Sequence, residues 1–186
     1  MFQKNKPETG NLLIAEPFLQ EVYFKRSVIL LAEHNESGSL GFIMNKPLDI
    51  KITNVAKDFP PFSGNLFYGG PVRNDLLFFV HTLGEQIEDS IPIIKGLFWG
   101  GKTEVVKESI KSGLINEDNI KFFVGHSGWS EGQLEEELKE NAWFMGKFDT
   151  DFIMNTEPRM LWRKTLINMG KEFAQYANYP ENPSYN

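Results

Sequence analysis

Cysteine is absent from the 186 residues of this chain. Disulfide bridges, thiolate zinc sites and cysteine nucleophiles are therefore excluded, and the absence permits a reducing cytoplasm. No run of 18 apolar residues occurs, so we expect no segment that spans a membrane. The amino terminus has no apolar run behind its lysines, which argues against a signal peptide. Together these absences predict a cytoplasmic protein without a membrane partner.

Basic charge is scarce as well. The chain has 19 Lys and Arg against 25 Asp and Glu, a net charge of −6, and the excess of acidic residues is similar in its two halves. A protein that grips a nucleic-acid backbone concentrates Lys and Arg in one region, so charge disfavours DNA as a partner. The three histidines, His34, His81 and His126, lie too far apart in sequence for a local metal site. We therefore predict no metal and no cofactor.

Apolar runs predict strands mainly in the first part of the chain. Residues 27–44 form a β-hairpin around the turn cluster at residues 35–38. Further strands are expected at residues 12–15, 66–68, 76–82, 91–99 and 120–124. Helical patterns cover residues 53–59, 103–112 and 131–141, the last with a capping box from Ser130 to Gln133. This order predicts an α+β fold, a compact mixed β-sheet with flanking helices and one or two lobes.

A long amphipathic helix is predicted at the carboxyl end. Large apolar residues recur there at steps of four and three, drawing one stripe along residues 158–177: Trp162, Leu166, Met169, Phe173 and Tyr176. Such a stripe is typical of core packing. The predicted organisation is a loose tail at residues 1–9, a single domain at residues 10–178 and a second loose tail at residues 179–186.

Two short patterns suggest catalysis or nucleotide binding, and neither carries the chemistry. Around Ser127 the order Gly-His-Ser-Gly-Trp lacks the second glycine of a nucleophile elbow, and no histidine follows it to complete a triad. We interpret Ser127 as a turn residue. Residues 96–103 match the P-loop pattern, but Leu97-Phe98-Trp99 is an apolar strand rather than a cradle of small residues. No nucleotide site is expected there.

Several motifs occur in an order that resembles the AlgH/YqgE-type family: GNLLIAEP at residues 10–17, RSVI at 26–29, Glu33-His34, Gly41 with Asn45-Lys46-Pro47, YGGPV at 68–72, and Gly125, Gly128 and Trp129 with Gln133-Leu134. The resemblance covers about residues 10–177. It implies a small bacterial cytoplasmic protein of compact αβ fold, linked by the family name to transcriptional regulation and without established catalysis. The family usually has alanine at the position of Ser127 and aspartate at that of Lys102, so the resemblance implies that neither residue carries a site.

The loops at the ends of the predicted strands are candidates for one ligand cleft, because strand ends offer polar side chains and free backbone N–H groups. The candidate residues are Glu33, His34, Asn45, Lys46, Gly69, Gly70, Arg73, Gly125, Gly128 and Trp129. Lys46 and Arg73 favour an anionic ligand, and the glycines permit close approach of backbone. The alternative is that these residues are simply turns.

Three functions follow. The sequence favours a non-enzymatic regulatory or binding module whose partner is a protein or a small anionic ligand. A DNA-associated transcriptional regulator is the first alternative; it rests on the family name, and no helix-turn-helix signature supports it. An enzyme that uses Glu33 and His34 as an acid–base pair is the second, although adjacent residues of a strand face opposite sides.

Overall fold

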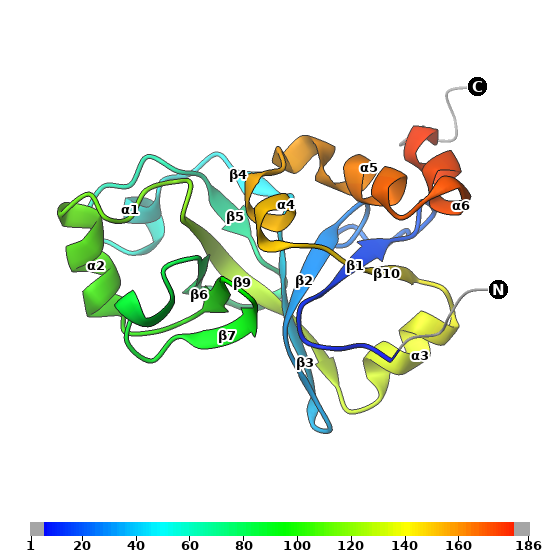
Figure 1. Ribbon diagram of the computed structural model, residues 1–186, viewed down its shortest axis with the longest axis horizontal. Coiled ribbons are helices and arrows are strands. Elements are labelled where there is room, and N and C mark those ends of the chain that lie inside the picture. Colours follow the sequence, from blue (N-terminus) through cyan, green and yellow to red (C-terminus); the bar gives the residue numbers. More distant parts are fainter. Residues whose placement is uncertain (1–5, 181–186) are drawn as a thin grey trace.

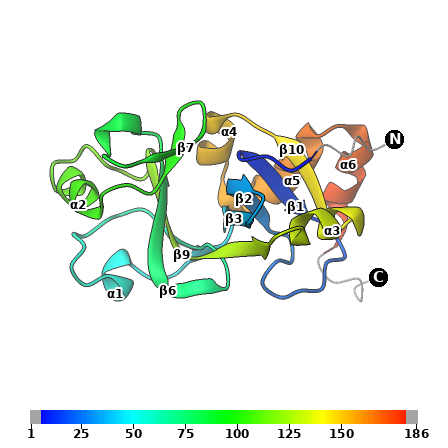
Figure 2. The same cartoon turned by 90° about the horizontal axis from the view of Figure 1, so that it is seen from below.

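A 10-stranded sheet forms the centre of the protein. The computed structural model describes residues 6–180, so residues 1–5 and 181–186, within the predicted tails, lie outside it. The main path of the sheet runs β10-β1-β2-β3-β9-β6-β8-β7. Two halves lie side by side in Figure 1, and β9 passes from one into the other. Figure 2 shows the same arrangement from below. The predicted α+β class is confirmed.

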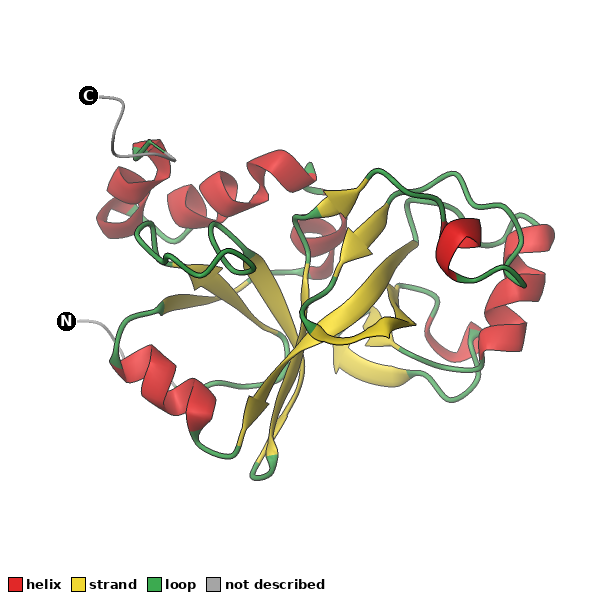
Figure 3. Cartoon of the chain, turned by 180° about the vertical axis from the view of Figure 1, so that it is seen from behind, coloured by secondary structure: helices red, strands yellow, loops and turns green. Residues whose placement is uncertain are grey.

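The first half contains four antiparallel neighbours in the order β10, β1, β2 and β3. Their bounds are Asn11–Ala15 for β1, Val28–Asn35 for β2, Gly38–Ile43 for β3 and Trp143–Lys147 for β10. Strands β2 and β3 confirm the predicted hairpin. Helix α3 (Gln133–Lys139) packs on one side, and α4 (Thr150–Asn155), α5 (Pro158–Asn168) and α6 (Lys171–Ala174) lie on the other (Figure 3).

Both faces of β1 are buried because helices cover both. Leu12 and Ile14 share a core cluster with Trp162 of α5, whereas Leu13 belongs to a second cluster with Leu134 of α3. Neighbouring residues enter different clusters because successive side chains of a strand point to opposite faces of the sheet. It explains why the sequence of β1 reads as a continuous apolar run rather than as an alternation of apolar and polar residues.

The second half is built on β9 (Ile120–Ser130), which pairs in parallel with β5 (Leu66–Tyr68) and antiparallel with β6 (Val72–His81). The sheet is therefore mixed, as predicted. Its other elements are β4 (Pro47–Leu48), α1 (Ile52–Val55), the 3-10 helix η1 (Gly84–Gln86), β7 (Ile91–Ile94), β8 (Leu97–Trp99) and α2 (Thr103–Lys111). A third core cluster, which includes Ile52, Val106 and Phe122, fills this half.

The long carboxyl-terminal helix is a wrong prediction. Helix α5 ends at Asn168, and a short α6 and a 3-10 helix η2 (Gln175–Asn178) follow. Gly170, with φ 109° and ψ 176°, lies outside the helical region and separates α5 from α6. The apolar stripe survives this break, since Trp162 and Leu166 are buried in the core while Met169, Phe173 and Tyr176 pack against it.

Two local predictions also need correction. Ser127 is not a turn residue, because residues 125–128 continue β9 and the Ser127 side chain is fully buried. Residues 91–99 form two strands rather than one, since the chain reverses at Lys95-Gly96 between β7 and β8. Within residues 6–180, no helix is long and apolar enough to cross a membrane.

Candidate functional site

The glycines predicted to line a cleft meet where the chain leaves β5 and runs beside β9. Gly69 N donates to Val124 O at 2.9 Å, and Gly69 O accepts from Ile43 N at 3.1 Å. A Cβ on Gly70 would overlap the backbone of His126, and one on Gly125 would overlap the Gly70 carbonyl. These glycines therefore permit two stretches of backbone to approach each other closely.

Asn45 and Lys46 adjoin this point, since Tyr68 N donates to Lys46 O at 2.9 Å. The side-chain amide of Asn45 fixes the backbone of residues 26–28. Its Oδ1 accepts a hydrogen bond from Val28 N and its Nδ2 donates one to Arg26 O, both at 2.9 Å. Lys46 Nζ donates to Tyr23 O at 2.6 Å. Burial lowers the pKa of the Lys46 ammonium, because desolvation disfavours its charged form.

Other predicted residues have separate neighbours. Arg73 is exposed, and its Nε lies 3.3 Å from Asp75 Oδ1. Gly128 is exposed on β9, whereas the next residue, Trp129, is buried on the opposite face. Trp129 Nε1 donates to Glu137 Oε2 at 2.9 Å, and Trp143 Nε1 donates to the same oxygen at 2.8 Å. One carboxylate thus ties α3 to β9 and β10.

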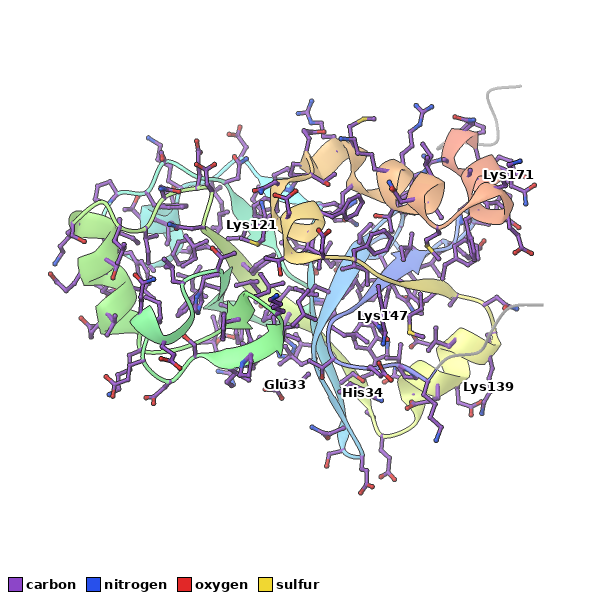
Figure 4. All side chains as sticks on the ribbon, viewed as in Figure 1. Glu33, His34, Lys121, Lys139, Lys147 and Lys171 are labelled. Atoms are coloured by element: carbon purple, nitrogen blue, oxygen red, sulfur yellow. The ribbon has the colours of Figure 1, made fainter. Side chains whose placement is uncertain are left out.

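Glu33 and His34 do not contact each other as an acid–base pair. His34 Nδ1 lies 2.8 Å from Ser39 Oγ, and its Nε2 lies 3.6 Å from Glu135 Oε1. In Figure 4 both residues lie toward the free end of the β2–β3 hairpin. Asn45, Lys46, Gly69, Gly70 and Gly125 are therefore neighbours, while the side chains of His34, Arg73 and Trp129 have other partners. That all ten line one ligand cleft stays a prediction.

A groove of about 700 Å³ follows the outer edge of β10. All five residues of β10 line it. Leu138 and Lys139 of α3 form one wall, and Asn168, Met169, Glu172 and Phe173 form the other. Figure 1 shows β10 between α3 on one side and α5 and α6 on the other. The surface is largely apolar, with Phe144, Met145 and Phe148 among its residues.

Within residues 6–180, the backbone of β10 is paired on one edge only. Strand β1 occupies that edge, and no other strand of residues 6–180 pairs with β10. Glu16 N donates to Ala142 O at 3.0 Å, which sets the alternation of the antiparallel ladder. The N–H groups of Trp143, Met145 and Lys147 consequently point away from β1, toward the groove. An unpaired edge of this kind is a template for another strand.

A second hollow, of about 470 Å³, is basic. We call it the basic pocket; its lining residues are Lys25, Arg26, Asn45, Lys46, Arg159, Met160, Trp162, Arg163 and Ala177. Five of them carry positive charge and none carries negative charge. Two of the candidate cleft residues, Asn45 and Lys46, belong to it. Among residues 6–180, no group of three or more His, Asp and Glu side chains has an arrangement that could hold a metal ion.

Comparison with known proteins identifies the family. The model of the family described as AlgH-like matches residues 12–174. The chain belongs to the AlgH-like family. A UPF0301 protein from Chlorobium limicola is 39% identical over 185 residues, covering 100% of this chain and 98% of the relative. A UPF0301 protein from Parabacteroides distasonis is 40% identical over 182 residues, covering 97% and 92%.

Two solved structures are similar in fold to this AlgH-like chain. The solution structure of the AlgH protein from Pseudomonas aeruginosa has a TM-score of 0.74 and 25% identity, covering 97% of this chain and 98% of that one. A crystal structure of a protein from Corynebacterium diphtheriae has a TM-score of 0.76 and 22% identity, with 94% of each chain covered, and is similar in fold. The resemblance found in the sequence motifs is confirmed.

None of the ten candidate residues lines the groove beside β10 of this AlgH-like chain, and only Asn45 and Lys46 line the basic pocket. The run Trp143-Phe144-Met145 is a signal for β10, because a short apolar, aromatic run after a helix is typical of a strand. The basic pocket has no such signal. Its cations come from residues 25 to 163, and only the fold brings them together.

Proposed function

We propose that this chain is a cytoplasmic binding module that receives an extended segment of a partner protein as an added strand along β10. The observation that carries the proposal is the edge of β10 with which no strand of residues 6–180 pairs, at the floor of an apolar groove. Addition of a strand to a free edge supplies backbone hydrogen bonds for affinity, and pockets for alternate side chains supply specificity.

The two walls of the groove specify the occupant. Phe144 packs against Phe173 and Tyr176, with ring centroids 5.1 and 5.4 Å apart, while Met145 packs on the cluster beside α3. Alternate side chains of an added strand would therefore meet α6 and α3 in turn. The lining has three lysines and two glutamates, so we expect apolar side chains at the centre of the partner segment and no strong net charge.

A second copy of this chain fits the groove less well. Its own β10 lies between the same helices, so pairing of the two β10 edges would bring the helices of both copies against each other. A single extended segment carries no such helices. The partner is therefore a peptide or a loop rather than the sheet edge of another copy.

The test uses a library of random peptides displayed on phage, selected on the folded protein. Calorimetry then measures the affinity of the strongest binder, as a synthetic peptide, for the wild type, Met145→Pro and Met145→Val. Proline removes the N–H that faces the groove and spares the bonds to β1, as tolerated on an edge strand. We expect Met145→Pro to weaken binding about tenfold or more, and Met145→Val to change it by no more than about threefold.

Hydrogen exchange locates the bound peptide. Binding should slow exchange of the Trp143, Met145 and Lys147 amides, because each gains an acceptor. Protection confined to another surface, or equal affinity of the folded Met145→Pro and Met145→Val variants, would contradict strand addition. An apolar ligand that binds without backbone bonds would be insensitive to the proline.

A further inference from the structure

The basic pocket concentrates positive charge on an acidic protein. Its five cations, Lys25, Arg26, Lys46, Arg159 and Arg163, come from three separate parts of the chain. The net charge of the whole protein is −6, so this cluster opposes the overall balance. Like charges gathered in a recess repel one another, and their field attracts an anion.

None of the five cations makes an ion pair within residues 6–180. The hydrogen bonds that they make go to neutral oxygens. Lys46 Nζ donates to Tyr23 O at 2.6 Å, Arg163 Nη2 donates to Asn178 Oδ1 at 2.9 Å, and Arg26 Nη2 donates to Tyr179 O. The positive charge in the pocket is thus not neutralised by a described carboxylate.

Arg26 is held in place before any ligand arrives. Its guanidinium carbon lies 4.5 Å from the centroid of the Trp162 ring, and the Trp162 indole donates to Ala15 O at 2.9 Å. Its backbone is left-handed, with φ 52°, and the hydrogen bond from Asn45 Nδ2 to Arg26 O supports that conformation. Strained backbone that surrounding bonds enforce is typical of ligand sites. A cation fixed in this way loses little freedom on binding.

An anion in the pocket would also stabilise the charged form of Lys46. Burial lowers the pKa of its ammonium, because the charged form has lost water without gaining a counter-charge. An anion in the pocket would supply that charge. Arginine forks and a lysine point charge together are the groups that proteins use for phosphoryl oxygens.

We propose that the basic pocket is a binding site for a small molecule that carries two phosphoryl groups. A phosphoryl group brings about 1.5 to 2 negative charges, so two of them approach the five positive charges of the lining. The volume of about 470 Å³ lies within the range of about 300 to 1,000 Å³ of small-molecule sites. The pocket shares no lining residue with the groove beside β10, so this site is independent of the proposed function.

The probe is inorganic pyrophosphate, titrated calorimetrically at low ionic strength. The variant is Arg159→Glu and its matched control is Lys164→Glu. Both residues are exposed on α5 and both changes alter the net charge equally, but only Arg159 lines the pocket. We expect Arg159→Glu to weaken binding about tenfold or more and Lys164→Glu to change it within about twofold. The thermal unfolding midpoint of each variant checks that it is folded.

Orthophosphate and duplex DNA complete the test. Orthophosphate should bind at least about tenfold more weakly than pyrophosphate, because it offers fewer charges to the same lining. Equal affinity for the two anions would overturn the assignment of two phosphoryl groups. Equal loss with Arg159→Glu and Lys164→Glu would overturn the pocket, since the general field of α5 would then account for binding. Absence of binding heat with pyrophosphate would overturn the proposal altogether. A gel shift of duplex DNA by the protein that added pyrophosphate does not reverse would overturn it as well.

Discussion

The Ser127 hydroxyl donates a hydrogen bond to the Gly69 carbonyl at 3.1 Å, across 58 positions of sequence. Ser127 has no exposed surface. The bond ties the centre of β9 to the chain that leaves β5. The serine in the Gly-His-Ser-Gly-Trp pattern therefore faces the interior and has no access to a substrate.

We predict that Ser127→Ala folds and loses about 1 kcal/mol of unfolding free energy, the usual contribution of one buried hydrogen bond. The loss stays small because Gly69 O keeps its bond from Ile43 N. Urea denaturation measures the change, with the exposed Ser130→Ala as the control. Covalent labelling of Ser127 in the folded wild type by a serine-reactive phosphonate probe would contradict this structural role.

Gly70→Ala should be far more damaging than Gly100→Ala. Both glycines have positive φ, 149° and 67°, but an added Cβ overlaps the His126 and Ser127 backbone at Gly70 and meets nothing within 4 Å at Gly100. We expect a loss of about 3 kcal/mol or more at Gly70 and about 1 kcal/mol at Gly100. Denaturant midpoints compare the two. Similar losses would mean that backbone strain, rather than close packing, explains Gly70.

Acidification should destabilise the protein through His81. Burial lowers the pKa of this imidazole below 6.5, and its Nδ1 accepts a hydrogen bond from Leu83 N at 3.3 Å. Between the lowered pKa and 6.5 the unfolded chain binds more protons, so the unfolding free energy falls as pH falls, by at most about 1.4 kcal/mol per pH unit.

Denaturation of the wild type and of His81→Gln at several pH values from about 5 to 7.5 checks this slope above the titration range of ordinary carboxylates. Glutamine does not titrate, so the variant should show a flatter dependence. A slope that is the same in both proteins would assign the acid sensitivity to other groups.

Lys102→Ala should leave any response to Mg-nucleotide unchanged. The strand β8 (Leu97–Trp99) occupies the middle of the P-loop pattern, and Lys102 Nζ pairs with Glu88 and lies 3.9 Å from Asp89. The charge of the Lys102 ammonium is already balanced by these two carboxylates, so it is not free to bind a phosphate. Calorimetry with Mg-ATP and Mg-GTP is the measurement. A binding signal in the wild type that Lys102→Ala abolishes would restore the P-loop interpretation.

Local patterns predicted the elements that local forces determine. The turn cluster at residues 35–38 predicted the hairpin of β2 and β3, and the spacing in residues 103–112 predicted α2. The period of apolar residues could not reveal the break at Gly170, because the stripe continues on the same face beyond it. Gly125 and Gly128 read as turn residues because the contact that requires glycine at 125 comes from Gly70, far away in sequence.

The candidate site was harder to predict for the same reason. The sequence marked Asn45 and Lys46 and predicted an anionic ligand for Lys46 with Arg73, but Arg73 pairs with Asp75. Lys46 instead lies with Lys25 and Arg26, which precede it, and with Arg159 and Arg163, which follow it by more than 100 positions. Charge clusters made by tertiary contacts have no spacing rule, so composition and periodicity cannot reveal them.

Because both halves of the molecule share strand β9, we expect that neither half folds without the other. The first part of β9 completes the sheet with β5 and β6, and its last part completes the sheet with β3. A gene fragment that encoded either half alone would leave one of these ladders without its central strand, and such exposed edges promote aggregation. Shuffling one half between relatives therefore requires a matching β9, and a functional truncation has no natural point at which to cut.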